Sequence, residues 1–271
     1  MSKAGSNFEE FVSVIKQLRD PEGGCPWDLA QTNESIRPYL VEECYEVLEA
    51  IDTKNDTELK KELGDVLLQV VLHSQIASDR GAFTIDDVVR LVTEKMISRH
   101  PHVFKSDVVT PNLVDAKTPE DVKLNWERIK QNERKNAGED QSILSGVPKA
   151  LPSLVRAERI GQKAAKFNFD WKESKDVWDK VEEELQELKQ ELGDFSNPNK
   201  DRVSSELGDL LFALAQLGRR LGTHSEDALR GCCDRFTRRF NQVERSLERP
   251  MPEYSIEELE ELWQKAKKEV G

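Results

Sequence analysis

Hydrophobic residues recur along this chain at the three- and four-residue intervals of amphipathic helices. The interval is clear in both halves, at Val41, Tyr45, Leu48, Val181, Leu185, Leu188 and Leu192. No convincing run alternates apolar with polar residues, which is the pattern of a half-buried strand. The pattern therefore predicts an all-α fold in which each helix buries one apolar stripe.

The elements of the first half recur in the same order in the second half. VEECYEVLEAI followed by KELGDVLLQVVLH corresponds to VEEELQELKQEL followed by SELGDLLFALAQL. Residues 136–152, between these halves, concentrate glycine, proline and small polar residues, which are typical of a connector. We predict two tandem helical-bundle domains, at residues 1–135 and 150–271, joined by a linker at residues 136–149.

Two predicted helices in each half carry acidic residues three positions apart, so that both acids of a pair project from one helix face. The pairs are Glu43 with Glu46, Glu62 with Asp65, Glu184 with Glu187, and Glu206 with Asp209. A short loop would make the two helices antiparallel neighbours and let four carboxylates converge. Because like charges at close range raise one another's pKa, such a group requires a cation, and all-oxygen ligands favour Mg²⁺ or Mn²⁺.

The alternative is that these acids form solvated helix faces, the usual role of an isolated E-x-x-E in a chain with a net charge of −12. Recurrence favours the metal site, because each half pairs the motif with E-L-G-D followed by an apolar helix. A further E-L-G-D, from Glu191 to Asp194, lies too close to Glu184 for a returning helix. We interpret it as the end of the preceding helix, before the loop formers Asn197 and Pro198.

Charge and composition restrict the partners of the chain. An acidic protein lacks the basic surface that binds nucleic-acid backbones, so we expect no general nucleic-acid binding. No apolar run is long enough to span a bilayer, and residues 1–10 lack the features of a signal peptide, so we expect a cytoplasmic protein without membrane contact. The four cysteines have neither C-x-x-C nor zinc-ligand spacing and are expected to be reduced thiols: Cys25, Cys44, Cys232 and Cys233.

The acidic pairs, together with RDPEGGCPWDLAQT and RHPHVF, resemble the MazG family of nucleoside triphosphate pyrophosphohydrolases over nearly the whole chain. The resemblance implies two MazG-like domains of the all-α nucleoside triphosphate pyrophosphohydrolase superfamily and a tight homodimer with intertwined helices. It also implies Mg²⁺-dependent hydrolysis of nucleoside triphosphates, such as ATP, to the monophosphate and pyrophosphate.

Carried over residue by residue, the resemblance places the catalytic metal ligands at Glu184, Glu187, Glu206 and Asp209. A second set in the first half falls at Glu43, Glu46, Glu62 and Asp65. Substrate contacts fall on several cations, one acid and one aromatic residue: Lys180, Glu183, Arg202, Arg235, Arg238, Arg239 and Trp263. Each of these contacts has a structural alternative, as a solvated helix residue, a partner of surface acids or a core anchor.

The two halves differ in positive charge. Tyr39 stands where the second half has Lys180, and His100 stands where it has Arg239. A neutral tyrosine cannot offset the charge of a phosphate group. We therefore expect the second half to be the main catalytic domain.

The chain lacks the motifs of several other chemistries. It has no Walker-type phosphate loop, no G-x-S-x-G turn and no E-x-x-H pair for a di-iron site. The predicted mechanism is attack of a metal-activated water on the α-phosphorus, with pyrophosphate as the leaving group and Glu183 as a candidate helper base. Two alternatives stay open: a non-catalytic helical dimer that binds a partner protein, and a pyrophosphohydrolase specific for one modified or deoxy nucleotide.

Overall fold

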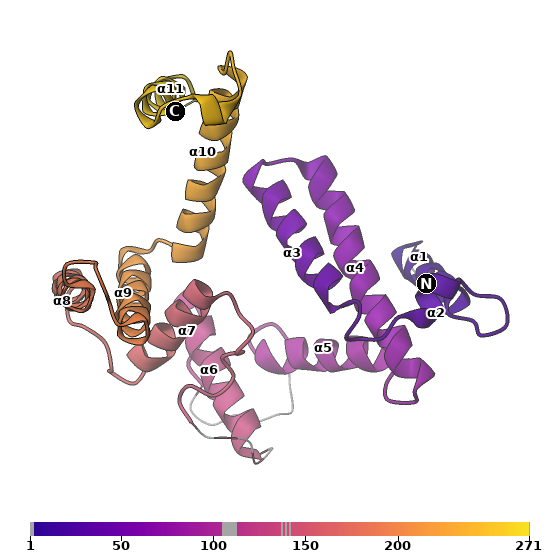
Figure 1. Cartoon of the computed structure of the whole chain (residues 1–271). Helices are drawn as coiled ribbons and strands as arrows, with labels where there is room; N and C mark the ends of the chain where they lie inside the picture. The colour runs from indigo at the N-terminus through magenta and orange to yellow at the C-terminus, as the bar shows by residue number, and fades with distance from the viewer. Residues whose placement is uncertain (1–2, 105–112, 137, 139, 141, 271) are drawn as a thin grey trace. The chain divides into compact units, whose positions relative to one another are not determined.

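The computed structural model describes residues 3–104, 113–136, 138, 140 and 142–270. All regular secondary structure in these residues is helical, with no strand, which confirms the predicted all-α fold (Figure 1). The chain divides into two compact units, Met1–Ala137 and Gly138–Gly271. The predicted linker at 136–149 includes residues 137, 139 and 141, which lie outside the described residues.

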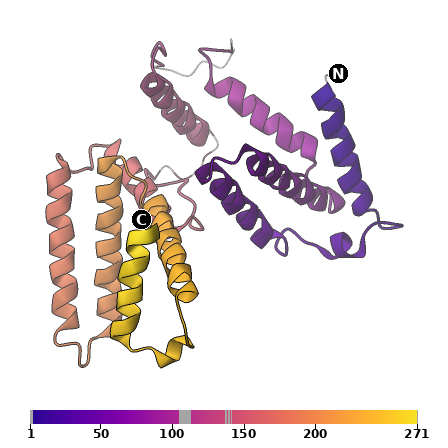
Figure 2. The same cartoon turned by 90° about the horizontal axis from the view of Figure 1, so that it is seen from above.

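The first unit is built around a pair of antiparallel helices. Its helices are α1 (Lys3–Leu18), α2 (Pro26–Ala30), α3 (Arg37–Asp52), α4 (Asp56–Asp79), α5 (Ile85–Arg99) and α6 (Pro119–Asn136). α3 and α4 lie side by side, as Figures 1 and 2 show, and α4 also packs against α1 and α5. The short turn between α3 and α4 ends at Asn55, whose side chain caps α4 by accepting hydrogen bonds from the backbone of Thr57 and Glu58.

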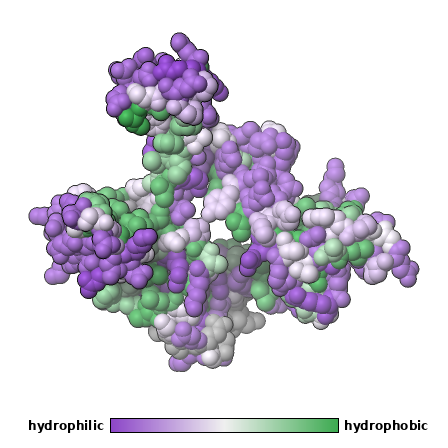
Figure 3. All heavy atoms as spheres, in the orientation of Figure 1, coloured by the Kyte–Doolittle hydropathy of each residue, from purple (hydrophilic) through white to green (hydrophobic). Residues whose placement is uncertain are grey.

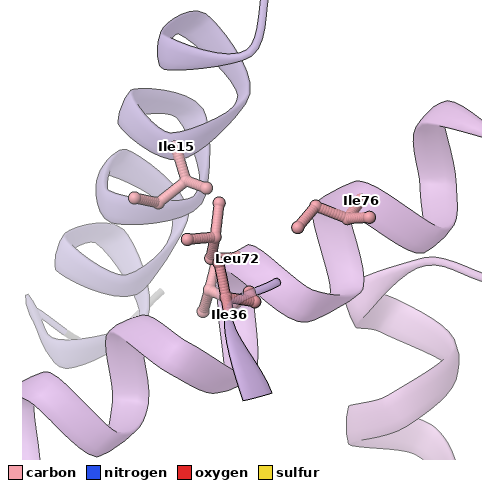
Figure 4. Packing of buried hydrophobic residues seen from close by; sticks show 5 residues of the cluster. Ile15, Ile36, Leu72 and Ile76 are labelled. Carbon is pink, nitrogen blue, oxygen red and sulfur yellow. The ribbon is translucent and has the colours of Figure 1, made fainter. Parts of the chain in front are cut away.

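The core of this unit lies between α1, the start of α3 and the second half of α4. Figure 4 shows four of its five buried residues with labels; the set is Ile15, Ile36, Val71, Leu72 and Ile76. These residues are supplied by the apolar stripes that the helical spacing predicts. The acidic pairs lie outside this core, toward the turn between α3 and α4.

Arg19 fixes the segment between α1 and α3. Its side chain is buried, and its Nε donates to Asp79 Oδ2, 2.6 Å away, at the end of α4. Its Nη1 also donates to the main-chain oxygens of Asp28 and Gln31. These bonds tie α2, which carries Trp27, to the end of α4.

The second unit contains a similar antiparallel pair. Its helices are α7 (Ser153–Ala165), α8 (Ser174–Leu192), α9 (Lys200–Leu221), α10 (Ser225–Arg245), the short 3-10 helix η1 (Met251–Glu253) and α11 (Ile256–Val270). α8 packs along α9, α9 also packs on α7, and α10 packs on α11 (Figures 1 and 2). Because α8 ends at Leu192, the second E-L-G-D is confirmed as a helix end, and Gly193 adopts a φ of 54° there.

Large apolar side chains are exposed on several helices, and Figure 3 shows apolar surface along α10. On that helix the exposed fraction is 52% for Leu229 and 56% for Phe236. Cys232 and Cys233, between them, are exposed free thiols. Among the described residues, no helix combines the length and apolar character needed to cross a membrane.

Candidate functional site

The hairpin of α8 and α9 brings the acidic residues of the second half together. Single carboxylate oxygens of Glu184, Glu206 and Asp209 all lie within 4.8 Å of one another. Glu187 lies on the same face of α8, and its side chain hydrogen bonds with Glu206. Burial, followed by the negative charges of Glu187, Asp209 and Glu184, raises the pKa of Glu206.

The hairpin of α3 and α4 repeats this arrangement in the first half. Oxygens of Glu43, Glu62 and Asp65 also lie within 4.8 Å of one another. Glu46 hydrogen bonds with Glu62, and burial together with this contact raises the pKa of Glu62. The pKa of Glu43 is also raised, first by burial and then by the charge of Asp65.

Burial and the neighbouring negative charges thus disfavour the ionised forms of Glu206, Glu43 and Glu62. A divalent cation between the oxygens would offset the repulsion and hold all four acids ionised. The donor set contains only carboxylate oxygens, which fits Mg²⁺ or Mn²⁺ and not a metal that prefers sulfur or imidazole ligands. Exposed acids are common without a metal, however, and it is the convergence from two helices that distinguishes these groups.

Lys180 and Glu183 lie beside the second-half acids. Lys180 Nζ is 2.6 Å from Glu184 Oε1 and 2.9 Å from Glu183 Oε1. These two contacts, with Glu184 contributing most, raise the pKa of Lys180. A positive charge is therefore fixed one helical turn from the first predicted metal ligand.

The remaining predicted substrate contacts lie at the start of α9 and on α10 and α11. Arg202 lies in the first turn of α9, and its Nη1 donates to Glu191, 3.0 Å away. The other four predicted contacts lie on α10 or α11: Arg235, Arg238, Arg239 and Trp263. The Trp263 ring packs on Phe236, with 5.0 Å between ring centroids. Their contact with substrate stays a prediction.

Sequence reasoning missed Gln69, which lies one turn beyond Asp65 on α4. Its side chain hydrogen bonds with the Glu43 carboxylate, and the residue is only 6% exposed. The four-residue spacing from Asp65 was the available signal. A glutamine at that spacing is too common on helices to be selected from the sequence without the neighbouring helix in place.

The second unit also contains an apolar cavity of about 280 Å³ between α7, α9 and the loop that precedes α8. Phe212, one turn beyond Asp209, lies in its wall together with Phe167 and Trp171. Gln216, which is fully buried, donates to the main-chain oxygen of Ala157 and accepts from Arg219. This polar side chain is therefore satisfied within the wall.

Comparisons with known proteins give a consistent result. A model of the MazG nucleotide pyrophosphohydrolase domain matches residues 31–104, which include the acidic residues of the first half. The chain is 45% identical over 270 residues to the nucleoside triphosphate pyrophosphohydrolase/pyrophosphatase MazG of Thermotoga maritima, and the match covers 98% of each chain. It is 38% identical over 267 residues to the nucleoside triphosphate pyrophosphohydrolase of Escherichia coli K12, covering 97% of this chain and 98% of that protein.

Proposed function

This chain belongs to the MazG family and is a nucleoside triphosphate pyrophosphohydrolase, and we propose that it uses Mg²⁺ bound by its acidic hairpins. The observation that carries the proposal is the convergence of Glu184, Glu206 and Asp209 within 4.8 Å. Glu187, which hydrogen bonds with Glu206, is proposed as the fourth ligand. The second-half hairpin is proposed as the main catalytic site, because Lys180 supplies a positive charge there.

The proposed reaction is attack of water on the α-phosphorus of the substrate. The new bond joins the water oxygen to the α-phosphorus, the bond to the bridging oxygen of the β-phosphate breaks, and pyrophosphate leaves. When bound, Mg²⁺ lowers the pKa of water and offsets charge on the phosphates. Lys180 neutralises phosphate charge next to the acids. Glu183, adjacent to Glu184, is proposed to accept the proton that the attacking water loses.

Phosphate recognition is proposed to involve the arginines of the second half. Arginine forms bidentate, charge-assisted hydrogen bonds with phosphate, so Arg202 and the α10 arginines are suited to the β- and γ-phosphates. Trp263 is suited to a flat apolar part of the substrate. We also propose a homodimer, supported by the exposed apolar side chains of α10, which another copy of the chain can cover.

The proposal is tested with the purified full chain and a panel of nucleoside triphosphates. We expect pyrophosphate release in the presence of Mg²⁺, no release in EDTA, and at least about a hundredfold loss of kcat for Glu206→Gln, because one metal ligand is removed. Glu182→Gln is the matched control, since this exposed acid lies on α8 of the same hairpin and accepts a hydrogen bond from Trp178. Undiminished turnover in EDTA or in Glu206→Gln would mean that the metal is placed wrongly.

A further inference from the structure

The two hairpins share one register. The side chains of Glu46 and Glu62 form a hydrogen bond in the first half, and those of Glu187 and Glu206 form one in the second. In the first half, this antiparallel register makes Glu43 face Asp65 and, one turn further from the connecting turn, makes Tyr39 face Gln69.

The same register holds in the second half. There the positions that correspond to Tyr39 and Gln69 are Lys180 and Ala213. The two hairpins therefore carry the same acids and differ in the pair of residues beside them. The second half has a cation and a methyl group, whereas the first has a phenol ring and an amide.

The Gln69 amide has one group without a partner. An ionised Glu43 carboxylate can only accept, so its hydrogen bond with Gln69 uses Nε2 of the amide and leaves Oε1 as the free end. Oε1 is buried and accepts no hydrogen bond in the described part of the chain. A buried carbonyl oxygen without a donor destabilises the folded protein, so a ligand that supplies an N–H or O–H at this point is favoured.

Unpartnered buried polar atoms continue along this end of α4. His73 lies one turn beyond Gln69, and its Nε2 is buried without a hydrogen-bond partner. The Oδ1 atom of Asn33 is also buried and without a partner. Asn33 Nδ2 lies 2.9 Å from His73 Nδ1 and donates to the His73 main-chain oxygen. In the second half the positions of Gln69 and His73 are occupied by Ala213 and Leu217, so this polar lining is specific to the first half.

Two aromatic rings lie next to each other, and one of them is Tyr39, which the helix register places opposite Gln69. The centroids of Trp27 and Tyr39 are 6.2 Å apart with an interplanar angle of 59°, and the exposed fractions of the residues are 53% and 41%. The helix that carries Trp27 is tied to the end of α4 by Arg19. Exposed rings on a fixed segment offer a surface on which a flat ring system can stack at little cost in conformational entropy.

We propose that the first-half site recognises its substrate by a nucleobase, which stacks on Trp27 and Tyr39 and donates an N–H to Gln69 Oε1. The phosphates then extend one helical turn toward Glu43, Glu62 and Asp65. The inference rests on the proposed function for metal binding by these acids. It gives the first half a preference for the base of the nucleotide, where the second half holds the phosphate chain with Lys180.

The test measures binding to the full chain carrying Glu184→Gln and Glu206→Gln, so that the second-half acids no longer bind metal. Calorimetry with Mg²⁺ compares tripolyphosphate, which has no base, with the α,β-methylene triphosphates of the four common nucleosides. We expect at least one nucleotide to bind about tenfold more tightly than tripolyphosphate, a difference of about 1.4 kcal/mol. Trp27→Ala and Gln69→Leu should each remove most of this difference, and any change in tripolyphosphate binding should be smaller.

Two further variants separate recognition from folding. Gln17→Leu, on the exposed face of α1, is the matched control for Gln69→Leu and should keep the preference for nucleotides. Tyr39→Lys introduces the second-half residue and should strengthen tripolyphosphate binding. Gln69→Leu removes a buried unpartnered oxygen together with the hydrogen bond to Glu43, and these two effects on stability are opposed. A glutamine that only braced Glu43 would give a variant with the nucleotide preference intact.

The outcomes distinguish this inference from the proposed function. Tripolyphosphate binding with no preference for any nucleotide would overturn base recognition alone. A preference that survives both Trp27→Ala and Gln69→Leu would also overturn it. Absence of binding by every ligand would count against the first-half metal site as well. Because binding is measured without turnover, a first half that binds nucleotides and does not hydrolyse them supports the inference.

Discussion

At the scale of single residues, Glu206 links metal binding to stability. Its pKa is raised in the folded protein, mainly by burial and by Glu187, so the folded state holds its proton more tightly than the unfolded state. The repulsion is therefore relieved as the pH falls through that raised pKa and returns as the pH rises. In EDTA, Glu206→Gln should raise the unfolding temperature at pH 7 and give a smaller gain at pH 5. With Mg²⁺ added, wild type should have the higher unfolding temperature, because only wild type keeps all the ligands. An equal gain for Glu206→Gln in EDTA at both pH values would contradict this view.

The stability of the second unit depends on the absence of a Cβ atom at Gly161. A Cβ at this position would lie 1.8 Å from Oε1 of the fully buried Gln216, which bonds with Ala157 and Arg219. Gly161→Ala should therefore lower the free energy of unfolding by about 1–3 kcal/mol, through overpacking and loss of these bonds. Urea unfolding measures the change. Gly208→Ala, where an added Cβ has open space in α9, is the control and should be neutral or stabilising.

At the scale of elements, the two acidic hairpins have the same acidic residues in the same helix register and differ in the residue one turn before the first acid. Lys180 contacts Glu184, whereas the corresponding Tyr39 carries no charge. A magnesium triphosphate is still an anion, so it should react mainly where a cation offsets the acids. Glu184→Gln with Glu206→Gln should reduce hydrolysis of common triphosphates by about a hundredfold or more. Glu43→Gln with Glu62→Gln should change it less than about twofold; equal losses would show that the halves contribute equally.

The acidic hairpins also show which features of the site can be predicted from the sequence. Three-residue spacing and the recurrence of E-L-G-D were enough to predict that Glu184, Glu206 and Asp209 converge, because helix geometry fixes which side chains share a face. The place of Trp27 beside Tyr39 was not predictable, since it depends on a loop fixed by Arg19. The free oxygen of Gln69 was equally hidden, because it depends on which atom of the amide meets Glu43.

At the scale of the whole molecule, the exposed apolar side chains of α10 lead us to expect a homodimer. Leu229 and Phe236 are more than half exposed in a single chain, and burying such side chains is favourable. Light scattering at micromolar concentration should give twice the 31.0 kDa chain mass. Leu229→Glu with Phe236→Glu should shift the protein toward the monomer, because it places charges on the apolar face. A monomeric mass for the unmodified protein would contradict the expectation.

The neighbouring Cys232 and Cys233 are exposed on the same helix. Exposed thiols can be oxidised by air during purification, and a disulfide between two copies would hold chains together that do not otherwise associate. A mass of two chains is therefore informative only in the presence of a reducing agent. Replacing both cysteines with serine should leave a genuine dimer intact, whereas a covalent artefact would disappear from non-reducing gels together with the thiols.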